Sequence, residues 1–436
     1  MRVLCVYTLL AAAPFAAADE PVRLVEAAPA GSQFRVVTSS TISGELLAPV
    51  ARDRPPERIA IGGKSSIDYA ERILPVDAKD ADFKCLRIYE KIAFRKTAGD
   101  RTDEMTLRPA VRRLVFLKKG QHKVPFSPDG PLLWGEIDLL RTDVVVPALA
   151  GLLPNNPVRP GESWKASSAA VAELTDLEKV EKGELTCTLD KVIATGPRQV
   201  AQVSFAGTLT GVNEDGPTRQ KLAGRLQVDL AAGCITFLTV DGEHVLLDAD
   251  GKDAGKITGT FELTRTPASG HPALTDPLVK GLDLNPSAEN TKLLYDTAEA
   301  GVRFVHPRNW RVVRTSGRQI TLDETDGAGL LVTLDTADGA PTAARYLREA
   351  LKELQERGAK ILDRAGPERM ADGVERFLVD AEIGKEKVTM AYFVVRQEKG
   401  AATLAARVPG PHRDARLKEL DGLARSFAVT RRLDGK

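Results

Sequence analysis

The chain has few of the residues that usually build reactive sites. Its 436 residues include four cysteines and five histidines, and aromatic residues make up only 5%. No two histidines lie at metal-ligand spacing, and none stands beside a cysteine in a zinc pattern. We therefore predict no metal site and no bound cofactor. The histidines are His122, His244, His271, His306 and His412.

An excess of one charge is also missing. Sixty-one basic residues balance sixty acidic ones, so nothing steers the whole chain toward nucleic acid or an anionic membrane. Three short basic clusters, Arg112-Arg113, Lys118-Lys119 and Arg431-Arg432, are expected to be solvated parts of strands or tails. We predict no nucleic-acid partner.

Long hydrophobic runs are confined to the first residues. Arg2 precedes an apolar run from Val3 to Phe15 and then three alanines, the pattern of a secretory signal peptide. We predict a signal peptide over residues 1–18, a mature chain from Asp19, and a secreted or periplasmic location. No later run approaches the ~20 apolar residues of a membrane span, so no transmembrane segment is expected after signal removal. Cys5 precedes the apolar run, which disfavours a lipid anchor.

The three remaining cysteines allow two interpretations. Cys187 and Cys234 lie in strand-like segments of one region, so an oxidising compartment could pair them and leave Cys85 free. Equally, all three could be buried free thiols that behave as small apolar residues. The sequence leaves both interpretations open.

Motifs for catalysis or ion binding are incomplete. Gly63-Lys64-Ser65 imitates the end of a phosphate-binding loop, but Arg58 stands where that loop needs glycine. Asp248 to Asp253 carries three carboxylates without the further ligands of a calcium loop, so a hairpin turn on Asp250-Gly251 is expected. Gly161-Glu162-Ser163-Trp164-Lys165 lacks the closing glycine of a nucleophile elbow.

Nothing else in the sequence points to a reaction. The mature cysteines have no adjacent histidine or second cysteine that would lower a thiol pKa. Trp134, Trp164 and Trp310 could line a ligand site, but each stands at an element boundary, where a large ring commonly packs against the core. We predict no catalytic residues, and that the protein is not an enzyme.

Alternating apolar and polar residues dominate from about Phe34 to Leu263, as on strands with one buried face. About four strands are expected over residues 34–118, and five more over 184–194, 199–211, 219–230, 233–247 and 256–264. Between the two sets, Leu133, Ile137, Leu140 and Val144 mark a helix that begins near Pro131, and Pro147 should end it.

Two strand sets around one helix predict an α+β, β-rich fold: a large curved antiparallel sheet over residues 19–264, with the helix on its concave face. Two separate β-domains remain the alternative. This part is similar, in pattern alone, to exported half-barrel proteins such as lipoprotein carriers. Residues 265–291 are rich in proline and small polar residues and are expected to form a linker.

The last part of the chain predicts a different domain. Four strands over about 301–335 lead to a helix near 341–357, which Gly358 should end. Four strands and a final helix over about 412–426 follow, the order of an α+β sandwich.

Gly301 to Trp310 resembles the opening of PsbP-like domains, in which an apolar strand leads to Pro307 and then Trp310. The resemblance covers residues 292–431 and implies a PsbP-like α+β sandwich. These matching residues are packing residues, so no binding residue is carried over.

These observations predict an exported, two-domain, non-enzymatic binding or scaffold protein of the cell envelope. Its partner would be another envelope protein. The alternative is a carrier that holds an apolar or lipid-like ligand in the concave face of the N-terminal sheet. A carrier should contain an internal apolar cavity of a few hundred Å³, whereas a scaffold should have a filled core and an exposed apolar patch.

Overall fold

The computed structural model describes residues 20–48, 57–77, 81–120, 122–196 and 198–433. The predicted signal peptide, residues 1–18, and Asp19 lie outside these residues. The chain forms two compact units. The first takes its described residues from 1–107, 116–124 and 141–281, and the second from 108–115, 125–140 and 282–436.

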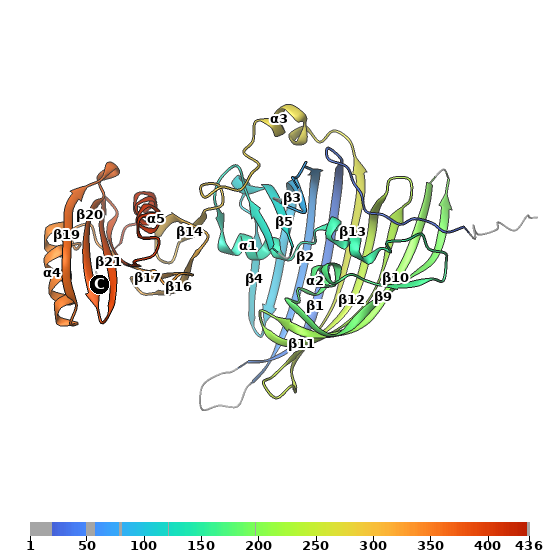
Figure 1. The fold of residues 1–436 in the computed structure, drawn as a ribbon, viewed down its shortest axis with the longest axis horizontal. Helices are drawn as coiled ribbons and strands as arrows, with labels where there is room; N and C mark the ends of the chain where they lie inside the picture. The colour runs from blue at the N-terminus through green and yellow to red at the C-terminus, as the bar shows by residue number, and fades with distance from the viewer. Residues whose placement is uncertain (1–19, 49–56, 78–80, 121, 197, 434–436) are drawn as a thin grey trace, which may run out of the picture. The chain divides into compact units, whose positions relative to one another are not determined.

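Most of the first unit is a large curved antiparallel sheet (Figure 1). Within the described residues it has twelve strands, in the order β6-β5-β3-β2-β1-β13-β12-β11-β10-β9-β8, with β4 paired to β3. The strands are β1 (Gln33–Ala48), β2 (Glu57–Ile73), β3 (Phe83–Ala98), β4 (Arg101–Thr106), β5 (Arg113–Lys119), β6 (His122–Phe126), β8 (Ser163–Lys165), β9 (Lys179–Thr195), β10 (Arg198–Asn213), β11 (Gly216–Asp229), β12 (Cys234–Leu247) and β13 (Asp253–Ala268).

The alternation of residue types sets the faces of this sheet. On β11, for example, Leu226 and Val228 are buried whereas Arg225 is exposed, as expected for a strand with one covered face. The five strands predicted over 184–264 are confirmed as β9 to β13. The predicted fold class, a β-rich chain with a large open antiparallel sheet, is also confirmed.

Pairing between β1 and β13 joins the two strand sets into one sheet. The register runs from Gln33 opposite Ala268 to Leu46 opposite Gly255. The sequence left open whether these strands make one sheet or two β-domains, because an alternating pattern does not identify the partner of a strand. This long-range pair settles the question in favour of one sheet.

The helix predicted near Pro131 differs from the observed one. Helix α1 (Trp134–Arg141) ends before Val144, whose N–H is bonded to the Asp143 carboxylate at 2.9 Å. Pro147 lies in the first turn of a 3-10 helix, η2 (Val146–Leu152), rather than at a helix end. Residues 125–140, which include most of α1, belong to the second unit.

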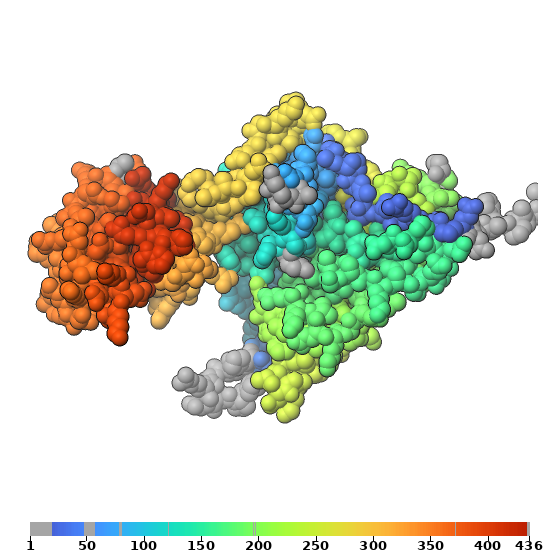
Figure 2. Space-filling view, in the orientation of Figure 1, coloured from blue at the N-terminus to red at the C-terminus, as the bar shows by residue number. Residues whose placement is uncertain are grey.

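A helix that the sequence did not reveal, α2 (Ser168–Thr175), covers the sheet of the first unit. The Ser167 hydroxyl caps it by accepting a hydrogen bond from the Ala170 N–H at 3.3 Å. The Gln220 side chain on β11 donates to the Thr175 carbonyl at the other end of the helix. In the space-filling view the teal-to-green segment that includes α2 forms part of the visible face of this unit (Figure 2). Two short elements, η3 (Pro272–Leu274) and α3 (Asp276–Lys280), follow β13.

The second unit is an α+β sandwich. Its described residues form a seven-stranded sheet in the order β16-β17-β18-β22-β21-β20-β19 and a four-stranded sheet in the order β23-β15-β14-β7. The elements not yet given are η1 (Pro109–Val111), β7 (Leu132–Leu133), β14 (Leu293–Thr297), β15 (Val302–His306), β16 (Trp310–Ser316), β17 (Gln319–Glu324), β18 (Gly329–Asp335), α4 (Ala343–Glu356), β19 (Lys360–Arg369), η4 (Ala371–Gly373), β20 (Glu375–Ile383), β21 (Glu386–Gln397), β22 (Gly400–Pro409), α5 (Arg413–Ser426) and β23 (Ala428–Val429).

The two long helices of the second unit pack in different cores. Leu420 and Leu423 of α5 share a core with Phe393 of β21, whereas Leu354 of α4 shares another with Tyr392, the next residue on that strand. Successive strand residues face opposite sides of a sheet, so α4 and α5 cover opposite faces. The strand–helix order predicted for residues 301–426 is observed. The short strands β14 and β23, which pair with β15, were not predicted.

Among the helices of the described residues, none has the length and apolar character needed to cross a bilayer.

Candidate functional site

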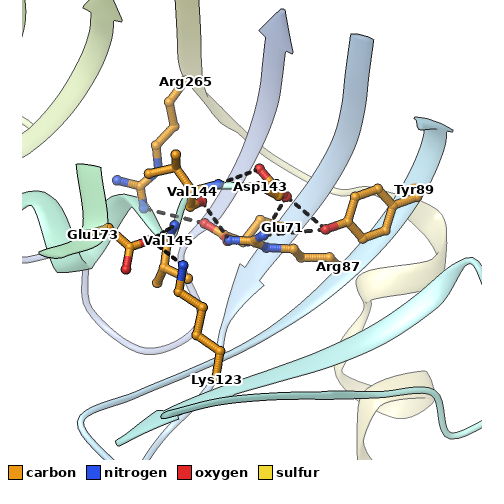
Figure 3. A network of polar contacts seen from close by, with 9 residues as sticks. All are labelled: Glu71, Arg87, Tyr89, Lys123, Asp143, Val144, Val145, Glu173 and Arg265. Atoms are coloured by element: carbon orange, nitrogen blue, oxygen red, sulfur yellow. Dashed lines mark hydrogen bonds and ion pairs between the residues drawn. The ribbon is translucent and has the colours of Figure 1, made fainter. Parts of the chain in front are cut away.

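The first unit has a buried ion network on the inner face of its sheet, the face of Val36 and Thr38. Figure 3 shows four of its members, Glu71, Arg87, Asp143 and Arg265. Arg87 and Glu71 are fully buried on adjacent strands β3 and β2, and Arg265 is fully buried on β13. Asp143 reaches them from the segment after α1, and Glu26 from the N-terminal segment.

Short contacts pair almost every charge in this network. Arg87 Nε lies 2.9 Å from Glu71 Oε2, and Arg87 Nη1 lies 2.7 Å from Asp143 Oδ2. The Tyr89 hydroxyl also donates to Asp143 Oδ2, at 2.9 Å. Arg265 Nη1 lies 2.7 Å from Glu26 Oε1, and its Nη2 lies 3.7 Å from Glu71 Oε1. These charged side chains are buried away from water, and their oppositely charged neighbours offset the cost of that burial.

Burial dominates the titration behaviour of the network. It raises the pKa of Asp143, although Arg87 and the Tyr89 hydroxyl oppose the rise. It raises the pKa values of Tyr69 and Tyr89 well above their ordinary range. Arg87 lies between the rings of Tyr69 and Phe116, 4.4 Å from each centroid, which adds a cation–π contact.

A second buried cluster holds α2 against the sheet. Glu173 of α2 lies 2.6 Å from Lys118 Nζ and 2.8 Å from Lys123 Nζ, and it accepts a hydrogen bond from the Val145 N–H. Burial alone would raise the pKa of Glu173, but the two ammonium groups outweigh it and lower that pKa. The prediction that Lys118 is solvated was wrong: it is 7% exposed, because α2 brings it a carboxylate.

Both clusters consist of buried or half-buried charges that are paired with one another. Each carboxylate of these clusters is held by a cation or a hydrogen-bond donor, and the groups are covered by protein. The Arg87 and Arg265 network occupies part of the inner face of β2, β3 and β13. We assign the network to packing on the inner face of the curved sheet.

The opposite face of the same sheet is hollowed. On β1, Thr41 and Ser43 are exposed and alternate with the half-buried Ile42, so they point away from the inner face. Register pairing extends this outer face over six strands as two neighbouring rows. The first row is Arg95, Lys64, Thr41, Thr260, Asp241 and Ala223; the second is Thr97, Gly62, Ser43, Thr258, Glu243 and Lys221.

These two rows line a groove of about 810 Å³, which we call the outer groove. The remaining lining residues, Ile42, Gly63, Gly242 and Gly259, belong to the inner-face row between them. A Cβ atom at Gly63 or Gly259 would meet the Ile42 side chain within about 3 Å. Because glycine has no side chain, Gly63 and Gly259 leave room for the Ile42 side chain on the inner face. At these two positions the groove is lined by backbone atoms.

Hydroxyl groups form the middle of the outer groove, and charges stand at its two ends. Thr41 and Thr260 share a hydrogen bond of 2.8 Å, and the Thr258 hydroxyl donates to the Ser43 carbonyl at 3.3 Å. Lys64 and Arg95 stand on β2 and β3, while Asp241 stands on β12. Such an arrangement can bind a polar ligand through hydrogen bonds.

The residues weighed in the sequence motifs occupy separate places. Lys64 lies in the middle of β2, where an extended backbone cannot form a phosphate-binding nest. Asp248 closes the turn after β12 by accepting from the N–H groups of Asp250 and Lys252. Ser163 lies on β8, and its hydroxyl bonds to that of Thr188.

The histidines are scattered over both units. His306 is 4% exposed, and burial lowers its pKa. Burial also lowers the pKa of His244 on β12. His271 Nδ1 accepts from the Ala273 N–H at the start of η3. Within the described residues, no three His, Cys, Asp or Glu side chains gather as a metal site would need.

Two of the three tryptophans have packing contacts. Trp310 is buried, and its Nε1–H donates to Glu419 at 2.9 Å. Trp164 donates to the Leu152 carbonyl. Trp134 is 40% exposed and lies beside Arg311. None of the three lines the outer groove.

The cysteines are free and buried. A disulfide between Cys187 and Cys234 is not formed, because β9 and β12 are separated by β10 and β11. Three strand spacings amount to about 14 Å, whereas a disulfide needs Cα atoms within ~7 Å. Burial raises the pKa of Cys187 to about 12 and that of Cys234 to about 11, so both thiols are poor nucleophiles.

Sequence reasoning missed both the network and the groove. Arg87 and Arg265 lie in segments where apolar and polar residues alternate. A charged residue in such a segment is expected to face solvent. The groove residues are ordinary exposed strand residues, and only the β1–β13 pairing brings their rows together. The run Thr258, Thr260 and Glu262 on β13 was the available signal of a polar face.

No protein-family model matches the chain, and no curated protein matches its sequence. Among solved structures, the chain is similar to PsbP (CyanoP) from Synechocystis sp. PCC 6803, with 14% identity, a TM-score of 0.26, and coverage of 34% of this chain and 95% of that one. It is similar to lipovitellin, with 9% identity, a TM-score of 0.31, and coverage of 56% and 26%. A third similarity is to MucB in complex with periplasmic MucA, with 10% identity, a TM-score of 0.16, and coverage of 90% and 93%. The similarity to PsbP is thus structural and weak.

Proposed function

We propose that this protein is an exported, non-enzymatic binding protein that holds a polar ligand in the outer groove of its first unit. The observation that carries the proposal is the groove of about 810 Å³ lined by two cross-strand rows of hydroxyl and charged side chains. That volume falls in the range of about 300–1,000 Å³ that is common for ligand sites.

The groove fits binding better than catalysis. Its hydroxyl groups lie on neighbouring strands, where sheet pairing fixes their spacing and pre-organises them for a ligand. No histidine or cysteine belongs to the lining, so the groove has neither the histidine base nor the thiol nucleophile that many covalent mechanisms use. These features support the non-enzymatic assignment.

The apolar carrier is the second candidate, and one observation favours it. Ile42, Ile61, Phe94 and Ile257 lie on the inner face toward the ends of the strands and are only half-buried. Against it stand α2 and the buried ion network, which occupy the part of this face near Arg87 and Arg265. We therefore place the ligand on the outer face.

Native mass spectrometry of the full chain purified from its own host tests the proposal. We expect a co-purifying small molecule that Thr260→Trp removes, because an indole on an exposed strand position fills the groove while strands tolerate aromatic residues. Glu262→Trp, on the same face of β13 and outside the lining, is the matched control and should retain the molecule. Retention by Thr260→Trp, or wild-type protein without any bound molecule, would contradict the proposal.

A further inference from the structure

Two like charges face each other at one end of the outer groove. Lys64 on β2 and Arg95 on β3 are direct cross-strand partners, and both are exposed. Like charges in this position destabilise a sheet, since their Cβ atoms lie about 4.5–5.5 Å apart. Arg95 has a carboxylate, Glu104, at 3.7 Å. Within the described part of the chain, Lys64 forms no ion pair.

The lining next to this pair favours a ligand rich in hydroxyl groups. Thr41 and Thr97 are the cross-strand neighbours of Lys64 and Gly62, and Ser43, Thr258 and Thr260 continue the polar floor. None of the lining residues is aromatic, which disfavours a nucleotide because bases bind by stacking on such rings. Ile42 is the one large apolar residue among them, which disfavours an acyl chain.

The far end of the groove carries charges of both signs, because Lys221 on β11 lines it together with Asp241 and Glu243 on β12. Asp241 stands in the same row as Lys64, three strand spacings away, or about 14 Å. Glu243 beside it is already paired with Lys256 at 2.7 Å. The charges at the β11–β12 end therefore offset one another, whereas the lining at the β2–β3 end carries two cations, Lys64 and Arg95, and attracts an anionic group.

The following inference rests on the proposed function. We propose that the ligand is an acidic saccharide whose carboxylate or sulfate ester binds between Lys64 and Arg95. The guanidinium and ammonium groups donate charge-assisted hydrogen bonds to the anion. The hydroxyls of Thr41, Ser43, Thr97, Thr258 and Thr260 bond to the sugar hydroxyls along the rows. The anion relieves the repulsion between the two cations, which explains their placement in direct opposition.

Calorimetric titration of the full chain with three tetrasaccharides tests this inference. Tetragalacturonate supplies carboxylates, a sulfated heparin-type tetrasaccharide supplies sulfate esters, and maltotetraose is neutral. We expect at least one acidic probe to bind about tenfold or more tightly than maltotetraose, because each charge-assisted hydrogen bond contributes more than a neutral one. The stronger acidic probe identifies the anion.

Lys64→Gln and Arg95→Gln should each weaken the acidic probe about tenfold or more and leave maltotetraose unchanged. Arg225→Gln is the matched control, since Arg225 is exposed on the outer face of β11 and outside the lining. Equal binding of acidic and neutral probes, or equal losses in all three variants, would overturn the inference. If the molecule that Thr260→Trp displaces proves neutral, this inference fails and the proposed function stands; if no molecule is displaced, both fail.

Discussion

At the scale of single residues, Glu71 is the most constrained charge in the first unit. It faces the guanidinium groups of Arg87 and Arg265, and all three side chains are fully buried. Within the described residues, Glu71 Oε1 has no hydrogen-bond partner. The same holds for two atoms of Arg265, Nε and Nη2. Removing the carboxylate would leave two buried cations with less compensation.

Glu71→Gln should therefore lower the free energy of unfolding by about 3–5 kcal/mol, the usual cost of breaking a buried ion pair. Asp68→Asn is the control on the same strand, because Asp68 pairs with the exposed Arg35 and should cost about 1 kcal/mol or less. Urea unfolding of both variants measures the difference. Similar small losses would show that the network is not a buried charge cluster.

His306 makes a prediction about pH. Burial lowers its pKa below the ordinary value of 6.5, so the unfolded chain binds more protons in the window below 6.5. Stability is then retained above 6.5 and falls as the pH decreases toward the lowered folded pKa. His306→Gln should reduce that fall, measured by urea unfolding at neutral and acidic pH, whereas the exposed His412→Gln should not. An unchanged pH slope in His306→Gln would refute the assignment.

The burial of Arg87 and Arg265 could not be read from the sequence. In the segment Lys84 to Tyr89, both faces of β3 are covered, so Leu86 and Cys85 are buried on opposite faces. Alternation then no longer reports exposure. The partners of these arginines, Asp143 and Glu26, lie in irregular segments far away in the chain. The alternation of residue types along strands does not predict the position of such segments.

At the scale of elements, the strands were more predictable than the covering helix. Long alternating strands such as β10 and β11 repeat one signal over many residues. Helix α2 has eight residues, too few to show a clear apolar stripe, and its attachment depends on Glu173, a charged residue. Tertiary contacts rather than local preference hold such a short helix.

Glu173→Ala should loosen α2 without unfolding the sheet. Lys118 and Lys123 would lose their shared carboxylate, and the Val145 N–H would lose its acceptor. We expect faster amide hydrogen exchange over residues 168–175, whereas Glu178→Ala, an exposed position just after the helix, should change little. Unaltered exchange in α2 would contradict the role given to Glu173.

On strands β2 and β3, a substitution that stabilises the sheet should weaken ligand binding. Lys64→Glu replaces the repulsion with Arg95 by an attraction, which should raise the free energy of unfolding by roughly 0.2–1 kcal/mol. The same change should abolish binding of the acidic probe. Loss of stability in this variant would show that Lys64 serves the fold rather than a ligand.

At the scale of the whole molecule, the pairing of β1 with β13 has the largest consequence. It joins strands from both ends of the first unit, and the groove rows run across this junction. The sequence predicted the strands and the α+β sandwich of the second unit, because both follow from local patterns. It could not predict a site assembled from six strands by long-range register.

The most direct test of the proposed ligand site is whether a bound ligand protects an engineered thiol in the outer groove from alkylation. Ser43→Cys places a cysteine in the outer groove, and Ser39→Cys places one on the same exposed face of β1, about 13 Å away and outside the lining. The native Cys85, Cys187 and Cys234 are buried and should react slowly; Cys5 is replaced by serine in both variants. Alkylation is followed with and without tetragalacturonate and a small-molecule extract of the host. We expect slower alkylation of Ser43→Cys with at least one of these additions and an unchanged rate for Ser39→Cys. Unchanged rates at both positions would rule out a ligand in the outer groove.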